Sequence, residues 1–297
     1  MKNSIFLSVV AAALASCGGN DHSYDATGTF EATEITVSAE QNGRLIEFLI
    51  DDGDAVEAGE QVALIDTVQL FLRARQIGAT RLVYASQRPE IQTQIAATRQ
   101  ELAKAKTERE RYAGLVADGA ANKKLLDDAE SRVAVLQKQL DAQLSSLNIS
   151  TASLNAQMNT ADAEQLLVAD QLAKCHVYAP ISGIVLETYA EPGEYAMTGK
   201  PLFKVADTAA MRLRAYLTSQ QLSRVKVGQK VVVYADYGDN TRRKYEGTVA
   251  WIASKSEFTP KTILTDDERA DLVYAVKIDV DNADGMLKIG MYGEVKL

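Results

Sequence analysis

Two stretches of this chain repeat the same spacing of glycines, and this repeat constrains the fold more than any other feature. The first is QNGRLIEFLIDDGDAVEAGEQVALI at residues 41–65, and the second is ISGIVLETYAEPGEYAMTGKPLFKV at residues 181–205. Three glycine pairs share one offset, since 183 − 43, 193 − 53 and 199 − 59 all equal 140: Gly43 and Gly183, Gly53 and Gly193, Gly59 and Gly199. We interpret them as structural glycines, at turns that need a positive φ or at points of close backbone approach.

Each copy alternates apolar, β-prone runs with turn residues. RLIEFLI and QVALI flank the turns DDGD and EAGE in the first copy, and IVLETYA and PLFKV flank EPGE and MTGK in the second. Such runs between turn signals are typical of strands. A copy of about 30 residues is too short to bury a core alone. We therefore expect the two copies to pack on each other as one small sandwich, built from residues 35–66 and 175–207.

The residues between the copies, 67–174, predict a long helical hairpin. Strong helix formers dominate this segment, and apolar residues recur at steps of three and four, as on the packed face of a helix. In the second arm this stripe includes Leu126, Ala129, Val133, Leu136, Leu140, Leu144 and Leu147, and in the first arm Ile91, Ile95, Leu102, Ala105, Tyr112 and Val116. Arms of about 50 residues each would be roughly 75 Å long.

Turn and break signals divide the hairpin. Gly119 is expected to end the first arm, and Asn122 is expected to cap the second. Pro89 predicts a break in the first arm, because proline cannot continue a helix without a kink. SSLNIST at 145–151 mirrors Pro89 about the tip and is rich in side chains that compete for helix hydrogen bonds. We therefore expect both arms to bend at that level.

The N-terminus predicts an export signal. Lys2 is followed by an apolar stretch from Ile5 to Leu14, which is too short to span a bilayer but fits a secretory signal. LASC at 14–17 resembles a bacterial lipobox, which implies a signal peptide at 1–16, a lipidated Cys17 and a tether at 17–23. The alternative is a plain signal peptide with an incidental cysteine. Cys175 would then be the only thiol of the mature chain, and we interpret it as a small buried hydrophobe.

Composition excludes several function classes. The net charge of −8, with no long basic run, argues against a nucleic-acid surface. Two His and two Cys are too few, and too badly spaced, for a usual zinc site. No G-x-x-x-x-G-K-S/T phosphate loop occurs, and acidic groups such as 51–54 and 266–268 lack calcium-loop spacing. We predict a protein that is not an enzyme and holds no cofactor or metal.

The split sandwich resembles the biotinyl/lipoyl carrier fold, but it lacks the modifiable lysine hairpin of a carrier. Together, the lipoprotein signal, this sandwich and the inserted hairpin resemble periplasmic adaptor proteins, the membrane fusion proteins of the haemolysin-secretion D type. The resemblance implies an elongated α+β protein with a β-barrel at 24–34 and 208–297, the lipoyl-like domain at 35–66 and 175–207, and an antiparallel coiled-coil hairpin at 67–174. Residues 257–278 resemble the branch paired with ABC exporters. The further membrane-proximal domain found in adaptors of proton-driven exporters is expected to be absent.

The resemblance also implies a docking motif at the hairpin tip. Adaptors that dock an outer-membrane channel carry Arg, Leu and Ser at fixed spacings, often followed by Asp. Arg111, Leu115, Asn122 and Asp127 occupy those positions, with Asn in place of Ser. Asp127 is expected in the first turn of the returning helix, where its charge suits the helix dipole. The alternative for Arg111 and Asp127 is a solvated helix face.

The function implied by the resemblance is transport across the cell envelope. The protein is expected in the periplasm, lipid-anchored at the inner membrane of a Gram-negative bacterium, where it would link an ABC-type exporter to an outer-membrane channel. A ring of copies, expected to number six, would line the duct between them. One alternative is an adaptor of a proton-driven exporter. The other is a structural coiled-coil envelope lipoprotein, but that class would explain neither the glycine repeat nor the tip motif.

Overall fold

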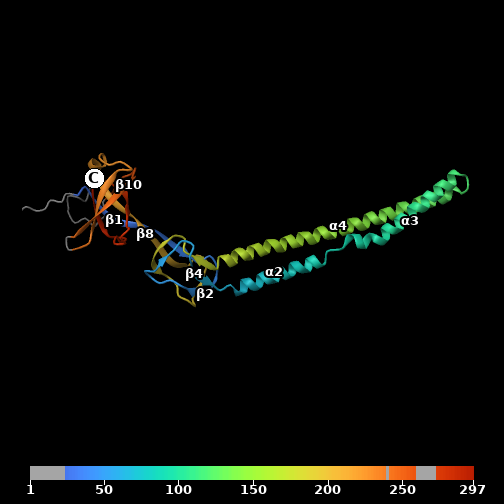
Figure 1. Cartoon of the computed structure of the whole chain (residues 1–297), viewed down its shortest axis with the longest axis horizontal. Helices are drawn as coiled ribbons and strands as arrows, with labels where there is room; N and C mark the ends of the chain where they lie inside the picture. The colour runs from blue at the N-terminus through green and yellow to red at the C-terminus, as the bar shows by residue number, and fades with distance from the viewer. Residues whose placement is uncertain (1–23, 239–240, 259–271) are drawn as a thin grey trace, which may run out of the picture.

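The computed structural model describes residues 24–238, 241–258 and 272–297. Three parts follow one another along an elongated molecule: a β-barrel, a β-sandwich and a helical hairpin (Figure 1). The predicted elongated α+β architecture is confirmed. The predicted signal peptide, Cys17 and the tether lie outside the described residues, as does most of the 257–278 segment.

The sandwich is built from both glycine-spaced copies. The first copy supplies β2 (Gly43–Phe48), β3 (Ala55–Val56) and β4 (Gln61–Ile65), and the second supplies β6 (Gly183–Thr188) and β7 (Tyr195–Ala196). One sheet has the order β5-β4-β2-β7, with β5 at His176–Tyr178, while β3 and β6 continue a second sheet beside β8 (Pro201–Thr218). Buried side chains from both copies share one core, which includes Leu45, Val62, Ile65, Val185, Leu202 and Phe203. The two copies therefore form one domain core.

Backbone hydrogen bonds show that the two copies are related by an approximate two-fold axis. Gly53 N–H donates to the Val185 carbonyl at 2.8 Å, and Gly193 N–H donates to the Leu45 carbonyl at 2.8 Å. These two bonds exchange under the 140-residue offset. The same exchange relates the bonds from Gly59 to Ala179 and from Gly199 to Ala39, both 2.8 Å. Strand pairing follows the same rule, since β3 pairs with β6 and β2 pairs with β7.

The six glycines divide into two structural roles. Gly53, Gly59, Gly193 and Gly199 adopt positive φ values between 84° and 93° in open turns. Gly43 and Gly183 instead begin β2 and β6 with φ outside the positive range, so they take the second of the two predicted roles and not the turn role. They are points of close approach, where a Cβ would lie 2.6 Å from Ile65 Cγ2 and 2.0 Å from the Ala206 carbonyl oxygen, respectively.

The barrel closes through a ring of six strands. Its order is β12-β10-β9-β13-β1-β8, and β8 pairs back with β12. The strand bounds are β1 Ala26–Ser38, β9 Lys230–Asp236, β10 Arg242–Ile252, β12 Leu272–Asp281 and β13 Tyr292–Lys296; the short β11 (Glu257–Phe258) pairs with β12, and the short helix α5 (Ser219–Leu222) follows β8. The separate core of the barrel includes Phe30, Met211, Leu213, Leu217, Val233, Val249, Ile278 and Val295.

Two long strands run through both β domains. β1 has 13 residues and β8 has 18, and the two remain paired from Thr27–Tyr216 in the barrel to Ser38–Pro201 in the sandwich. Their register shifts between Glu31 and Thr33, at the level where the barrel meets the sandwich. This pair is the covalent and hydrogen-bonded link between the two domains.

The hairpin has one broken arm and one continuous arm (Figure 1). The first arm comprises α2 (Val68–Ser86) and α3 (Ile91–Ala117), separated at the predicted break around Pro89. Both pack on α4 (Lys123–Ala173) through two apolar seams. The α2–α4 seam contains Leu70, Ala74, Ile77, Ala161, Val168 and Leu172, and the α3–α4 seam contains Ile91, Ile95, Leu102, Ala105, Val133, Leu136, Leu140, Leu144 and Leu147.

The predicted second break is wrong, because α4 is one helix of 51 residues that passes through SSLNIST. Thr151 Oγ1 donates to the Leu147 carbonyl at 2.8 Å, one turn back along the same helix. This hydroxyl therefore bonds within the helix without interrupting it. Proline differs because it lacks the N–H and its ring clashes with the preceding turn. In the described part of the chain, no helix is both long and apolar enough to cross a bilayer.

Candidate functional site: the hairpin tip

The turn between α3 and α4 lies at the end of the molecule farthest from the barrel (Figure 1). Gly119 has a φ of +69°, and its N–H donates to the Val116 carbonyl at 3.1 Å. Ala120 N–H donates to the Leu115 carbonyl at 2.8 Å. A positive-φ glycine with these backward bonds is a common way to end a helix. Gly119 thus ends the first arm, as the sequence predicted.

Asn122 begins the second arm as its N-cap. Its backbone is extended, with φ −83° and ψ 136°, and its Oδ1 accepts a hydrogen bond from Lys124 N–H at 3.0 Å. The capping role predicted for Asn122 is therefore confirmed. The amide oxygen is committed to this bond, whereas the side chain itself is exposed. Its NH₂ group is available to donate to a partner.

The other predicted tip residues are also exposed, which is the condition for a docking surface. Arg111 and Leu115 are exposed on α3, where Leu115 retains 38% of its surface, and Asp127 is exposed on α4. Among the described residues, neither Arg111 nor Asp127 forms an ion pair. One placement is corrected: Asp127 is the fifth residue of α4, and the first turn holds no acidic residue. Its carboxylate therefore lies beyond the turn where the dipole effect is strongest.

The structure adds Leu125 to this surface. Its side chain is 44% exposed, one residue before the predicted apolar stripe begins at Leu126. Leu126 is half-buried. In the sequence, Leu125 is an apolar residue that does not fit the spacing of the packed face. It was overlooked because the adjacent Leu126 does fit that spacing. Two exposed leucines, one on each helix, therefore accompany the charged residues at the tip.

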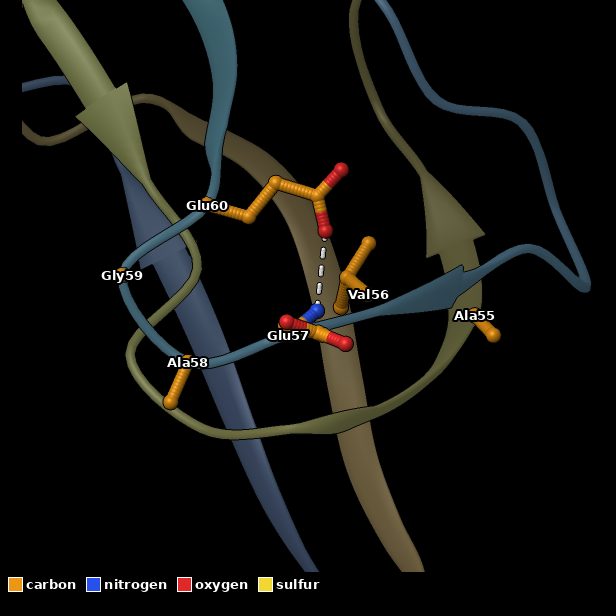
Figure 2. Close-up of a pocket in the computed structure, with 6 residues that line it drawn as sticks. All are labelled: Ala55, Val56, Glu57, Ala58, Gly59 and Glu60. Carbon is orange, nitrogen blue, oxygen red and sulfur yellow. Dashed lines mark hydrogen bonds between the residues drawn. The ribbon is translucent and has the colours of Figure 1, made fainter.

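A depression on the sandwich is lined by the first-copy turn Ala55–Glu60. Figure 2 shows the Glu60 carboxylate directed at the Glu57 N–H, which donates to it at 2.9 Å. Ala58 N–H donates to Ser182 Oγ at 2.9 Å. These polar groups thus stabilise the turn itself. Within residues 24–238, 241–258 and 272–297, no group of His, Cys, Asp and Glu is arranged to hold a metal ion.

The nearby acidic residues serve the same structural role. Asp54 Oδ2 accepts a hydrogen bond from Asp51 N–H at 2.8 Å, and Asp52 Oδ1 accepts two from Thr188. Cys175 is buried as predicted, and burial raises the pKa of its thiol. A thiol held protonated in an apolar core is a poor nucleophile. The tip therefore remains the candidate site.

Comparison with known proteins decides the family. A family model described as RND MFP, barrel-sandwich hybrid domain, matches residues 33–208, which is more than half of the chain. The chain belongs to this family of membrane fusion proteins. A UPF0194 membrane protein from Acidithiobacillus ferridurans is 26% identical over 284 residues, covering 89% of this chain and 83% of that protein. A UPF0194 membrane protein from Citrobacter koseri is 27% identical, covering 98% and 96%.

A solved structure supports the same fold. The crystal structure of MacA from Actinobacillus actinomycetemcomitans superposes with a TM-score of 0.56, at 22% identity, covering 91% of this chain and 76% of that one. At this identity the likeness concerns the fold alone. The matched family segment, 33–208, contains the whole sandwich and the whole hairpin. The split sandwich and its inserted hairpin are thus the part of this membrane fusion protein that defines its family.

Proposed function

We propose that this membrane fusion protein is the periplasmic adaptor of a tripartite efflux or secretion system. It links an inner-membrane exporter to an outer-membrane channel and takes part in transport without catalysing a reaction. The observation that carries the proposal is the exposed, capped turn at the far end of the hairpin. Arg111, Leu115, Asn122 and Asp127 stand there at the spacings of channel-docking adaptors.

The chemistry of the tip suits a protein partner. Arg111 can donate two parallel hydrogen bonds to a carboxylate or to backbone carbonyls. Leu115 lies four residues later and therefore on the same helix face. Leu125 adds a second exposed apolar side chain from the returning helix. Apolar anchors beside an arginine are the composition that recurs at interface hot spots.

Crosslinking in cells tests docking. A cysteine placed at Ala120 should crosslink to the outer-membrane channel in the wild-type background, and Leu115→Asp should abolish both crosslinking and export. The matched control is Val135→Asp, because Val135 is 58% exposed on α4 away from the tip. Its crosslinking and export should remain at the wild-type level. Normal docking by the Leu115→Asp protein would show that the tip motif is an ordinary helical turn with no role in docking.

The class of exporter is a separate part of the proposal. Residues 257–278 resemble the adaptor branch that works with ABC exporters, which supports an ATP-driven partner. The family description names RND membrane fusion proteins, which favours the proton-driven alternative. Copurification of the full chain from membranes, followed by mass spectrometry, distinguishes the two. Recovery of a transporter without a nucleotide-binding domain would overturn the ABC assignment.

Membrane attachment is proposed to occur through a lipid on Cys17, at the inner membrane. Cys17→Ala should remove the lipid and release the protein from the membrane fraction in cells that lack the exporter. The mass of the mature N-terminal peptide reports lipidation directly. An unlipidated N-terminal peptide in the wild-type protein would refute the anchor while leaving the docking proposal intact.

The β domains are also proposed to fold independently of the hairpin at residues 67–174. Asp66 N–H donates to the Arg44 carbonyl at 2.8 Å, and Ile65 N–H donates to the Cys175 carbonyl at 2.9 Å. The two ends of the insertion therefore leave the sandwich side by side. A short Gly/Ser linker in place of 67–174 should leave a cooperatively folded β protein, because it closes only a short gap. Loss of a cooperative thermal transition would show that the sandwich needs the hairpin.

A further inference from the structure

The end of the barrel that faces away from the sandwich carries an exposed loop between α5 and β9. The strand β8 runs from Pro201 in the sandwich to Thr218 in the barrel, so α5 and the residues that follow it lie at this outer end. The barrel is itself at the opposite end of the molecule from the hairpin tip (Figure 1). Residues 223–229, with the sequence SRVKVGQ, are called the barrel-end loop below.

The barrel-end loop has a defined shape. Val225 is 6% exposed and belongs to the barrel core, so it holds the loop against the barrel. Gln229 N–H donates to the Lys226 carbonyl at 3.1 Å, and Lys226 N–H donates to Gln229 Oε1 at 3.1 Å. Gly228 has a φ of +88°, at the position where a type II turn requires a positive φ. This turn leaves Val227 at its apex with 64% of its surface exposed.

The charge around this apex is basic. Arg224, Lys226 and Lys230 are all exposed. Among the described residues, none of the three forms an ion pair. The surrounding stretch 208–235 contains Lys and Arg but no Asp or Glu, although the net charge of the whole chain is −8. Cationic side chains beside an exposed apolar one favour contact with an anionic membrane surface.

The N-terminal segment joins the barrel next to this loop. Gln221 of α5 donates a side-chain hydrogen bond to the Asp25 carbonyl, and Asp25 N–H donates to the Val295 carbonyl at 2.9 Å. Cys17 precedes Asp25 by eight residues, and eight residues span at most about 30 Å. A lipid on Cys17 would therefore keep this end of the barrel close to a membrane.

We propose that the barrel-end loop rests on the surface of the lipid bilayer. Arg224 and Lys226 contact anionic phospholipid headgroups there, and Val227 inserts among them. The occupant is inferred from charge complementarity and from the reach of the chain to the proposed lipid anchor, so part of the argument rests on that anchor. A lipid chain alone holds a protein near a membrane without setting its tilt. The loop would supply a second contact that turns this end of the barrel toward the bilayer.

Vesicle binding tests the loop without the lipid. The mature chain lacking Cys17, residues 18–297, is mixed with vesicles of phosphatidylglycerol and phosphatidylcholine, or of phosphatidylcholine alone, and sedimented. It should bind the phosphatidylglycerol vesicles, and salt at about 0.5 M should release it. Arg224→Glu with Lys226→Glu should weaken binding by about tenfold or more, and Val227→Ser by about threefold. No binding by the wild-type chain, or equal binding to both kinds of vesicle, would overturn the proposal.

The matched control is Lys104→Glu with Lys106→Glu, because it reverses two exposed charges at the same spacing on α3, far from the barrel. It should bind like the wild type. An equal loss in the control would assign the effect to net charge and refute the loop. Since the assay contains neither the lipid nor an exporter, failure of the Cys17 anchor or of the adaptor function would leave its result unchanged.

A fluorescent label shows which end of the molecule touches the bilayer. Without Cys17, the remaining Cys175 is buried, so Val227→Cys provides one accessible thiol for an environment-sensitive dye. Its emission should shift to shorter wavelength on phosphatidylglycerol vesicles. The same dye on Ala120→Cys, at the hairpin tip, should not shift. An unshifted label at position 227, or equal shifts at both positions, would contradict the proposed contact.

Discussion

The two halves of the sandwich share a backbone but differ in their side chains. Their turns exchange the same hydrogen bonds across the approximate two-fold axis. Yet Glu60 of the first half corresponds to Lys200 of the second, and Asp52 corresponds to Pro192. The repeat therefore preserves the glycines and the backbone hydrogen bonds of the strands and turns, whereas the exposed side chains differ. Variants at equivalent positions can separate the contribution of the backbone from that of the side chains.

The largest difference is expected between Gly183→Ala and Gly43→Ala. A Cβ at Gly183 would lie 2.0 Å from the Ala206 carbonyl oxygen, which is fixed in β8. A Cβ at Gly43 would lie 2.6 Å from Ile65 Cγ2, a side-chain atom that can move. Gly183→Ala should destabilise by about 3 kcal/mol or more, and Gly43→Ala by about 1–2 kcal/mol. Denaturant unfolding of the two variants, compared with wild type, measures both values.

The equivalent turn glycines should behave alike. Gly53 and Gly193 have φ values of 93° and 92°, and a Cβ at either would contact nothing within 4 Å. Alanine there suffers only from the left-handed backbone, so each variant should lose about 1–2 kcal/mol. Thermal unfolding of both proteins tests the equality. Losses that differ by about 1 kcal/mol or more would mean that the two-fold relation does not extend to the energetics.

Asp52→Ala probes a contact that exists in one half only. Its carboxylate accepts from Thr188 N–H at 2.7 Å and from Thr188 Oγ1 at 2.9 Å. Both bonds are exposed, so their loss should cost about 1 kcal/mol. Pro192→Ala at the equivalent position removes no such bond, but it frees the unfolded chain and should itself cost about 0.4–1 kcal/mol. An Asp52→Ala protein as stable as wild type in chemical denaturation would show that the Asp52 bonds add nothing.

The smallest effect concerns pH. A hydrogen bond from Lys200, with its nearby positive charge, lowers the pKa of the Glu194 carboxyl below its ordinary value of 4.5. A depressed carboxyl pKa stabilises the folded state above that ordinary value, and the contribution is lost as the pH falls toward the folded pKa. Lys200→Gln should therefore melt slightly below wild type at neutral pH. The gap should close as the pH falls below 4.5, and a gap independent of pH would assign the effect to packing.

Local signals in the sequence predicted the sandwich and the hairpin, whereas the barrel was implied by the resemblance to periplasmic adaptors. Glycine spacing is informative because few residues can replace glycine in a left-handed turn or at a backbone contact. The Pro89 break and the Asn122 cap were likewise predictable from single residues. The mirrored break at 145–151 was not, because a hydroxyl either interrupts a helix or bonds within it, and the surrounding seam decides.

Features that depend on tertiary proximity could not be predicted in the same way. The arginines of α2 and the acids of α4 are visible in the sequence, but Arg81 meets Asp162 only because α2 packs on α4 through the cluster of Ile77, Ala161 and Val168. The sequence alone did not show which of the adjacent residues Leu125 and Leu126 faces solvent. That depends on how α4, which begins after the Asn122 cap, packs on α3. The continuity of β1 and β8 through both domains was also not predicted. The expected boundary between barrel and sandwich, at residues 34/35 and 207/208, falls inside each of these strands.

The continuous β1–β8 pair gives the molecule a mechanical property. A pull between the barrel and the hairpin acts along both strands, so the covalent backbones of β1 and β8 carry it in parallel. Two extended backbones resist stretching, but a pair of strands resists bending only weakly. The register shift between Glu31 and Thr33 is the natural place for such bending. We therefore expect the angle between the barrel and the sandwich to vary more readily than the length of the β1–β8 connection between them.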